Sequence, residues 1–191
     1  MIALVGVAPY LLLVAAAFIK FAVVLSILRR ALAKSAVPPA AVVTLVSLGM
    51  AFLVTAPIGE AVWPELEKPT PNFKGVTAPV RDFLSKHTPQ VEKQSFLELS
   101  QKLHGKAPVQ STDLSVLGPA FVTAELKGAF QSGFLLFLPF LVIELLVASI
   151  LLALGMNNIS SELVSLPFKL LLFVVVDGWH LLLHGLVLGY T

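Results

Sequence analysis

Four charged side chains lie inside otherwise apolar stretches of this sequence: Lys20, Glu144, Lys169 and Asp177. Even on a lenient insertion scale, one such group costs about 2.5 to 3.5 kcal/mol at the centre of a bilayer. Ionisable groups in these positions usually pair, line water or face another protein chain. Because the two cations balance the two anions, we expect buried ion pairs. The alternative for the two lysines is that the ammonium group reaches the membrane surface.

The spacing of Lys169 and Asp177 indicates where their partners lie. Eight residues separate the two, which corresponds to roughly 80° around a continuous helix. They would flank one side of that helix without touching each other. We therefore expect their partners on other helices.

Two histidines are the strongest candidates for metal chemistry. His180 and His184 are four residues apart, with Asp177 three residues before, so one helix could present all three to zinc. Neither an HExxH nor a GxSxG motif accompanies them, glycine-rich phosphate loops are absent, and the chain has no cysteine. We therefore expect no metal, no cofactor and no catalytic residue, with the histidines making polar contacts at the end of a helix.

The composition is that of a membrane protein. Of the 191 residues, 57% are hydrophobic and 13% are charged, whereas soluble domains carry about 25% charged residues. The stretch from Pro64 to Ala129 holds 8 of the 13 Lys and Arg and 7 of the 11 Asp and Glu. The largest basic cluster is Arg29, Arg30 and Lys34, which is too small to indicate a nucleic-acid partner.

Four apolar runs are long enough to be membrane segments, since a spanning helix needs about 20 such residues. They run over residues 2–28, 39–62, 129–154 and 163–188. We predict an all-α, multi-pass protein with a first helical pair over 1–63, a loop region over 64–128 and a second pair over 129–191. Pro57, Pro139 and Pro167 fall in or beside these runs and predict kinked or hairpin helices.

The basic cluster sets the expected orientation. Lys and Arg concentrate in cytoplasmic connections, so residues 29–38 are expected in the cytoplasm and the loop 64–128 outside. The N-terminal run lacks the basic start of a signal peptide, and we expect it to be retained.

The outer loop is expected to contain short amphipathic helices. Thr88 with Pro89 has the form of an N-cap followed by a first helical residue. Apolar residues recur at helical spacing on both sides of it: Val80, Phe83 and Leu84 before, and Phe96, Leu99 and Leu103 after. The apolar faces would pack on the outer ends of the spans, or else bind a partner.

Several long motifs resemble one family, in the order in which they occur along the chain. They are Phe18 to Lys20, Val23 to Arg29, Val37 to Pro39, Phe121 to Lys127, Phe137 to Glu144, Leu152 to Met156, Leu166 to Phe173 and Asp177 to Trp179. Together they resemble the SctR/FliP family of the type III secretion export apparatus. The ending from Leu182 to Tyr190 is more similar to injectisome (virulence-associated) members than to flagellar ones.

The resemblance implies a structural export-gate subunit of the bacterial inner membrane. It implies a homo-oligomer, a pentamer, that forms a helical ring with SctS/FliQ-like and SctT/FliR-like subunits, next to an SctU/FlhB-like subunit. Secreted proteins would pass through this ring. Glu125 and Lys127 lie in a family motif, and Glu125 with Lys169 is our hypothesis for an ion pair between subunits.

The resemblance also implies a gate at the turn 155–162. Family members often carry a run of methionines there, thought to form a flexible gasket, whereas this chain has Met156 followed by Asn157 and Asn158. The asparagines either supplement the gasket or are simply turn residues.

Other classes of protein remain open from composition alone. A small ion or proton transporter could also use buried charges, but transporters usually show repeated halves and no repeat is evident here. A membrane-embedded assembly scaffold is the third alternative.

Overall fold

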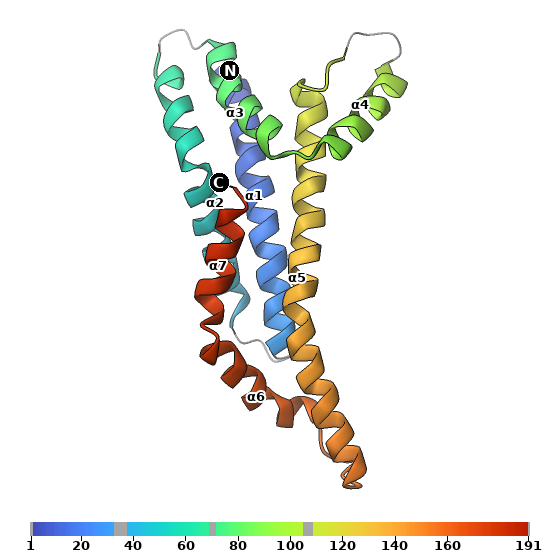
Figure 1. The fold of residues 1–191 in the computed structure, drawn as a ribbon. Coiled ribbons are helices and arrows are strands. Elements are labelled where there is room, and N and C mark those ends of the chain that lie inside the picture. Colours follow the sequence, from blue (N-terminus) through green and yellow to red (C-terminus); the bar gives the residue numbers. More distant parts are fainter. Residues whose placement is uncertain (1, 33–37, 69–71, 105–108, 191) are drawn as a thin grey trace. The chain divides into compact units, whose positions relative to one another are not determined.

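The computed structural model describes residues 2–32, 38–68, 72–104 and 109–190, with the backbone alone for 2–6 and 104. Its helices are α1 (Ile2–Leu32), α2 (Ala40–Leu66), α3 (Phe73–His87), α4 (Gln90–His104), α5 (Leu114–Ala153), α6 (Ser161–Val175) and α7 (Gly178–Leu188), as Figure 1 shows. No strand occurs among these described residues. The predicted all-α class is confirmed.

Three helices are long and apolar enough to cross a membrane: α1 from Val7 onwards, α2 and α5. Helices α6 and α7 pass the same test together, although the chain bends by 60° between them. They form a broken span, so the structure contains up to four spans in its described residues. The chain is thus a multi-pass membrane protein with one interrupted segment.

The chain divides into two compact units. The first consists of residues 1–20 and 48–128, and the second of residues 21–47 and 129–191. Helices α1, α2 and α5 contribute residues to both units. Each unit therefore combines segments that are distant in the sequence.

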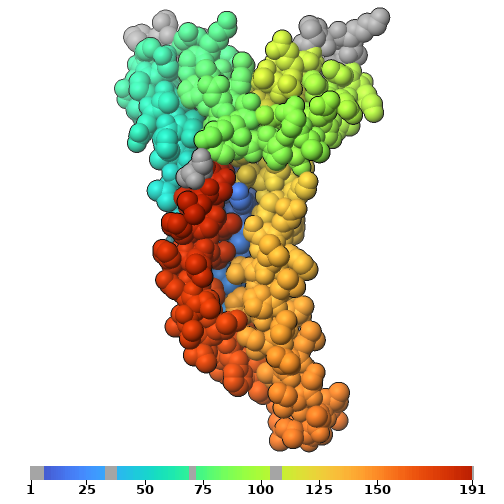
Figure 2. Space-filling model, in the orientation of Figure 1, coloured from blue at the N-terminus to red at the C-terminus, as the bar shows by residue number. Residues whose placement is uncertain are grey.

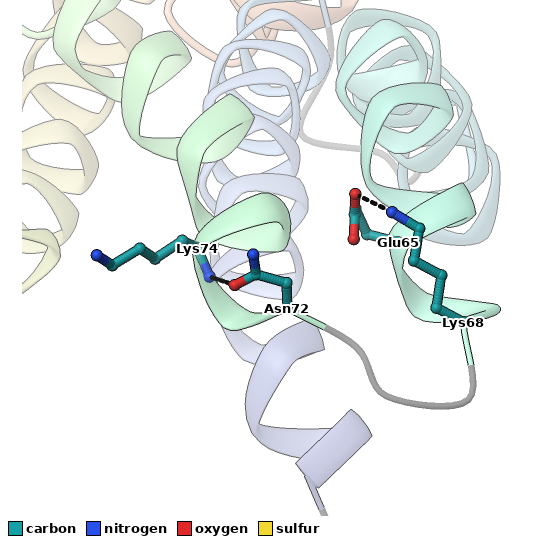
Figure 3. Close-up of polar contacts among 4 residues, drawn as sticks. All are labelled: Glu65, Lys68, Asn72 and Lys74. Atoms are coloured by element: carbon teal, nitrogen blue, oxygen red, sulfur yellow. Dashed lines mark hydrogen bonds and ion pairs between the residues drawn. The ribbon is translucent and has the colours of Figure 1, made fainter.

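In the first unit, α3 buries the face that its spacing predicts. Val76, Val80 and Leu84 recur every four residues and are fully or almost fully buried. The ring of Phe83 packs edge-on against Phe121 of α5, with centroids 6.1 Å apart. The start of α3 is fixed by Asn72, whose side-chain oxygen accepts from the Lys74 N–H at 3.1 Å (Figure 3).

The prediction that Thr88 caps the start of α4 is wrong. Thr88 is instead the C-cap of α3, and its hydroxyl donates to the Leu84 carbonyl at 2.6 Å. At the start of α4, the Lys93 N–H donates to the Pro89 carbonyl. Proline suits this position because it has no N–H group that would need an acceptor. The hydroxyl is nearer to the last free carbonyls of α3 than to the first N–H groups of α4.

Helix α5 begins at Leu114, 15 residues before the predicted third segment at residue 129. The carbonyl of Asp113 accepts from the N–H groups of Val116 and Leu117. The carboxylate of Asp113 accepts from the N–H of Gln110. The sequence prediction stopped at the charged pair Glu125 and Lys127, whereas the helix continues through both because each finds an ionic partner.

In the second unit, a hydrophobic core joins the end of α1 and the start of α2 to α5 and α6. Its buried members are Leu25, Leu28, Ala31, Leu32, Val43, Phe140 and Phe173. The helices α2, α5 and α6 run through Pro57, Pro139 and Pro167, and the chain breaks instead at Asp177. The segment predicted over 163–188 is thus a bent pair of helices, in agreement with the expectation of kinked or hairpin helices.

Candidate functional site

Lys20 and Glu125 form an ion pair inside the first unit. Lys20 Nζ on α1 lies 3.3 Å from Glu125 Oε2 on α5, and the side chains are only 13% and 8% exposed. An isolated charge at this depth would be strongly destabilising, whereas the pair offsets much of the desolvation cost. The helix α5 can therefore carry Glu125 in the middle of a mostly apolar surface.

A second ion pair fastens α4 to α5. Lys127 Nζ donates to Glu92 Oε1 at 2.9 Å, with Glu92 9% exposed and Lys127 59% exposed. The hydrogen bond from Lys127 is the main reason why the pKa of Glu92 is lowered from its ordinary value of 4.5. A backbone hydrogen bond and the charge of Lys127 act in the same direction, and burial opposes them. Glu92 is thus held as a carboxylate.

A third pair joins α5 to α6 in the second unit. Lys169 Nζ donates to Glu144 Oε2 at 2.6 Å, a short bond between charged groups. Lys169 is 4% exposed and Glu144 is 33% exposed. The two most deeply placed charges of the last two apolar segments therefore neutralise each other within one chain.

The hypothetical pair of Glu125 with Lys169 from another subunit stays a prediction. Both residues already have a partner in their own chain, Lys20 and Glu144 respectively. Neither charge depends on a second subunit for its neutralisation. The sequence indicated which charged residues need a partner. It did not indicate which residue is the partner of which, because that depends on which helices are neighbours.

Asp177 has a backbone role at the break between α6 and α7. Its φ and ψ of 50° and 52° are left-handed, and it is the one non-glycine residue with positive φ in the described chain. His180 and His184 stack on α7 with ring centroids 5.3 Å apart. The described residues contain no group of three or more side chains able to hold a metal ion.

The turn after α5 is built by a specific helix-ending motif. Gly155 has a φ of +72°, and its N–H donates to the Leu152 carbonyl at 3.0 Å while Met156 N–H donates to the Leu151 carbonyl at 2.9 Å. This is a Schellman motif, which favours glycine at its left-handed position and an apolar contact between the third residue before the cap and the second after it. Leu151 and Met156 line one cavity, as that motif predicts.

Asn157 and Asn158 occupy the centre of the next turn. Ile159 N–H donates to the Met156 carbonyl at 3.2 Å, so the two asparagines lie between donor and acceptor. Asparagine is favoured at such positions because its short polar side chain can bond to the neighbouring backbone. The geometry supports the interpretation of both as turn residues.

Sequence reasoning missed the apolar companions of Met156. Residues 152–160 are all exposed, and in Figure 2 the turn is open at the surface. Leu152 is 69% exposed, Leu154 65%, and Met156 and Ile159 46% each. These residues could have been identified from the apolar residues on both sides of Gly155, because turns in soluble proteins are normally polar.

Comparison with known proteins decides the family. The sequence pattern described as the FliP family matches residues 1–186. The Yop proteins translocation protein R of Yersinia pestis is 40% identical over 195 residues, which cover 95% of this chain and 90% of that protein. The hypersensitivity response secretion protein HrcR of Ralstonia nicotianae is 40% identical (95% and 91% covered), and the flagellar biosynthetic protein FliP of Bacillus subtilis is 36% identical (97% and 87%).

The chain belongs to the FliP family. The family predicted from the sequence motifs is thereby confirmed. The matched region of this FliP-family chain includes the three ion pairs between helices, the break at Asp177 and the turn at Met156. The site thus consists of ion pairs that join helices and of an exposed apolar turn.

Proposed function

We propose that this chain is a structural subunit of a type III secretion export gate in the bacterial inner membrane. Relatives named for translocation, secretion and flagellar biosynthesis match it over at least 95% of its length. Its partners would be further copies of itself, in a pentamer, with SctS/FliQ-like, SctT/FliR-like and SctU/FlhB-like subunits. The cargo would be secreted proteins, and the chain would act without catalysis.

The observation that carries this proposal is the uncovered surface of α5. In the most apolar stretch of α5 only 6% of the residues are buried within the chain, against 44% for α1. The helix has 40 residues and is about 60 Å long, whereas the hydrocarbon core of a bilayer is about 30 Å thick, so lipid cannot cover its whole length. Packing in a ring of helices would cover the rest.

The turn at Met156 is the proposed gate. A thioether is flexible and polarizable enough to fill an irregular gap and to yield to a passing chain. Rotational symmetry would multiply one exposed methionine, with its leucine and isoleucine neighbours, into a girdle. Asn157 and Asn158 shape the turn that presents Met156.

Deletion and purification test the proposal together. We expect deletion of the coding sequence to abolish secretion, and the affinity-tagged chain to purify as a large complex with its partner subunits. Purification as a monomer that carries an ion flux in vesicles would instead support the ion-transporter alternative. Loss of secretion while the chain is absent from the mature complex would identify it as an assembly scaffold.

A further inference from the structure

Met156 is the one readily oxidised side chain in its part of the sequence. Between Phe140 and Phe168 the chain holds no other methionine and no cysteine, tryptophan, tyrosine or histidine. The whole chain lacks cysteine, so no thiol of its own competes for an oxidant. Oxidants commonly convert methionine to its sulfoxide. An oxidant that reaches this turn therefore acts on a single sulfur atom.

Met156 is also more accessible than the other methionine whose surroundings the structure describes. It is 46% exposed, and the residues from 152 to 160 around it are all exposed. Met50 lies inside α2 and is only partly exposed. Oxidation of a sulfur atom follows its exposure to solvent. Because hydrogen peroxide is small and uncharged, we expect it to react first at Met156.

The apolar character of Met156 is part of the construction of the turn. In the Schellman motif that ends α5, Met156 N–H donates to the Leu151 carbonyl at 2.9 Å, and such a motif favours an apolar contact between these two positions. Both residues line a cavity of about 260 Å³, together with Leu152 and Ile159. A sulfoxide is polar, and its oxygen needs a hydrogen-bond donor. Oxidation therefore replaces an apolar side chain by a group that draws water into the turn.

We propose that Met156 is a redox-sensitive modification site, and that its oxidation to the sulfoxide by hydrogen peroxide opens the closed gate. The inference rests on the gate proposed at this turn. A lone pair of the sulfur attacks one oxygen of the peroxide and the O–O bond breaks. The proton of the transferred oxygen passes to the leaving hydroxide, so the sulfur is oxidised by two electrons and the peroxide is reduced to water. A methionine sulfoxide reductase, with electrons from a dithiol, restores the thioether.

Symmetry multiplies the effect of this single atom. In a ring of identical chains, one sulfoxide per chain becomes a circle of polar groups around the girdle. The exposed neighbours Leu152, Leu154 and Ile159 have no sulfur, so peroxide leaves their polarity unchanged. Met156 is therefore the member of the apolar turn through which an oxidant changes the closure of the gate.

Peptide mass spectrometry of the purified complex tests the modification itself. The complex is treated with hydrogen peroxide, and the gain of one oxygen atom is followed over time at each methionine. We expect Met156 to be oxidised several-fold faster than Met50, which serves as the control within the same chain. Equal rates, or a slower rate at Met156, would overturn the proposal.

Dye release from proteoliposomes that hold the complex tests the consequence for the gate. Peroxide should increase the release of a trapped small dye from the unmodified complex and from Met50→Leu, the matched control. Met156→Leu lacks the sulfur, so its release should not rise with peroxide, whatever its starting level. Met156→Gln carries a polar amide of similar length and should release dye without any oxidant.

Two results would overturn the proposal at this step. One is a peroxide-dependent rise in dye release that persists in Met156→Leu, because the oxidised residue would then lie elsewhere in the complex. The other is full conversion of Met156 to the sulfoxide without a rise in release from the unmodified complex. In either case, loss of secretion on deletion of the coding sequence would still support the export-gate subunit, so the two failures are distinguishable.

Discussion

At the scale of single residues, the buried ion pairs specify neighbours more than they add stability. Two charges taken out of water lose hydration that their attraction only about repays, so an apolar pair of the same size is often no less stable. A charge without its partner, however, is strongly unfavourable. The Lys20–Glu125 and Lys169–Glu144 pairs therefore penalise any packing in which α1 or α6 shifts along α5.

Removing Lys169 tests this interpretation. Lys169→Met leaves Glu144 without its partner. We expect the free energy of unfolding to fall by up to about 3 kcal/mol, the lower end of the range for buried pairs, because the Glu144 side chain is 33% exposed. Lys169→Met with Glu144→Gln should recover much of the loss, since no charge is then stranded. Thermal unfolding of the purified protein in detergent measures both, and Lys102→Met on the exposed side of α4 is the control. A double variant no more stable than the single one would contradict the pairing.

Met156 is the residue whose removal should open the gate. Met156→Ala shortens an exposed apolar side chain in the turn, which lines a cavity together with Leu151. We expect cells carrying the assembled variant to leak ions and small molecules at normal complex abundance, with secretion largely retained. Membrane conductance and small-molecule uptake are the measurements. Leu145→Ala, 58% exposed on α5 but away from the turn, should not leak. If permeability stays normal, Met156 only packs the turn.

At the scale of elements, the sequence predicted the helical segments better than their ends. Apolar runs placed α1, α2 and most of α5, because hydropathy reports directly on burial or membrane contact. The first turns of α5 were assigned to the loop, since Glu125 and Lys127 are charged and their partners come from α1 and α4. The break at Asp177 was not predictable in position, because Gly178 is the only local residue that marks it, while the prolines, which are stronger helix breakers, lie inside continuous helices.

The bend between α6 and α7 depends on small size at Gly178. A Cβ atom there would overlap the ring of Phe173, which is 5% exposed in the core of the second unit and packs edge-on against Trp179. Gly178→Ala should therefore cost about 1 to 3 kcal/mol through overpacking. Asp177→Gly should be neutral or stabilising, because it relieves the left-handed strain of a side-chain-bearing residue. Thermal unfolding distinguishes the two. Equal losses in both variants would show that the bend is not held by this contact.

The attachment of α4 to α5 should depend on pH. The pKa of Glu92 in the folded protein is lower than its ordinary value of 4.5, chiefly because Lys127 donates to it. The pair therefore contributes stability that is fully present above about pH 4.5 and is lost as the pH falls through the lower folded-state value. Glu92→Gln should be less stable than the unmodified protein at pH 7, with a difference that shrinks towards pH 3.

Thermal unfolding across this pH range measures the effect of Glu92. Glu98→Gln on the same helix is the control and should follow the unmodified protein, because Glu98 is exposed. A constant difference between Glu92→Gln and the unmodified protein from pH 7 to pH 3 would remove the ion pair as its cause.

At the scale of the whole molecule, the uncovered apolar surface of α5 says more about function than the core does. The family and the all-α membrane class followed from long motifs and composition, which need no knowledge of packing. The site was predictable as a set of residues, but the partners of Lys20, Glu125 and Lys169 were not, because the pairings join helices that are distant in sequence. The uncovered apolar surface of α5 could not be read from the sequence either, since lipid-facing and subunit-facing helices have similar composition.

The orientation of the chain in the membrane is the last prediction. Arg29 and Arg30 close α1, and basic residues concentrate on the cytoplasmic side. After two further crossings, α2 and α5, we expect the turn at Asn158 to be on that side again, and α3 and α4 to lie on the periplasmic side. Because the chain has no cysteine, single cysteines report without background. Lys86→Cys should react with an impermeant thiol reagent in intact spheroplasts, and Asn158→Cys should react only after the membrane is opened. Both positions are exposed in the folded chain, so burial does not limit either reaction. The reverse pattern would invert the orientation and place the Met156 turn on the periplasmic side, where it could not close the entrance to cytoplasmic cargo.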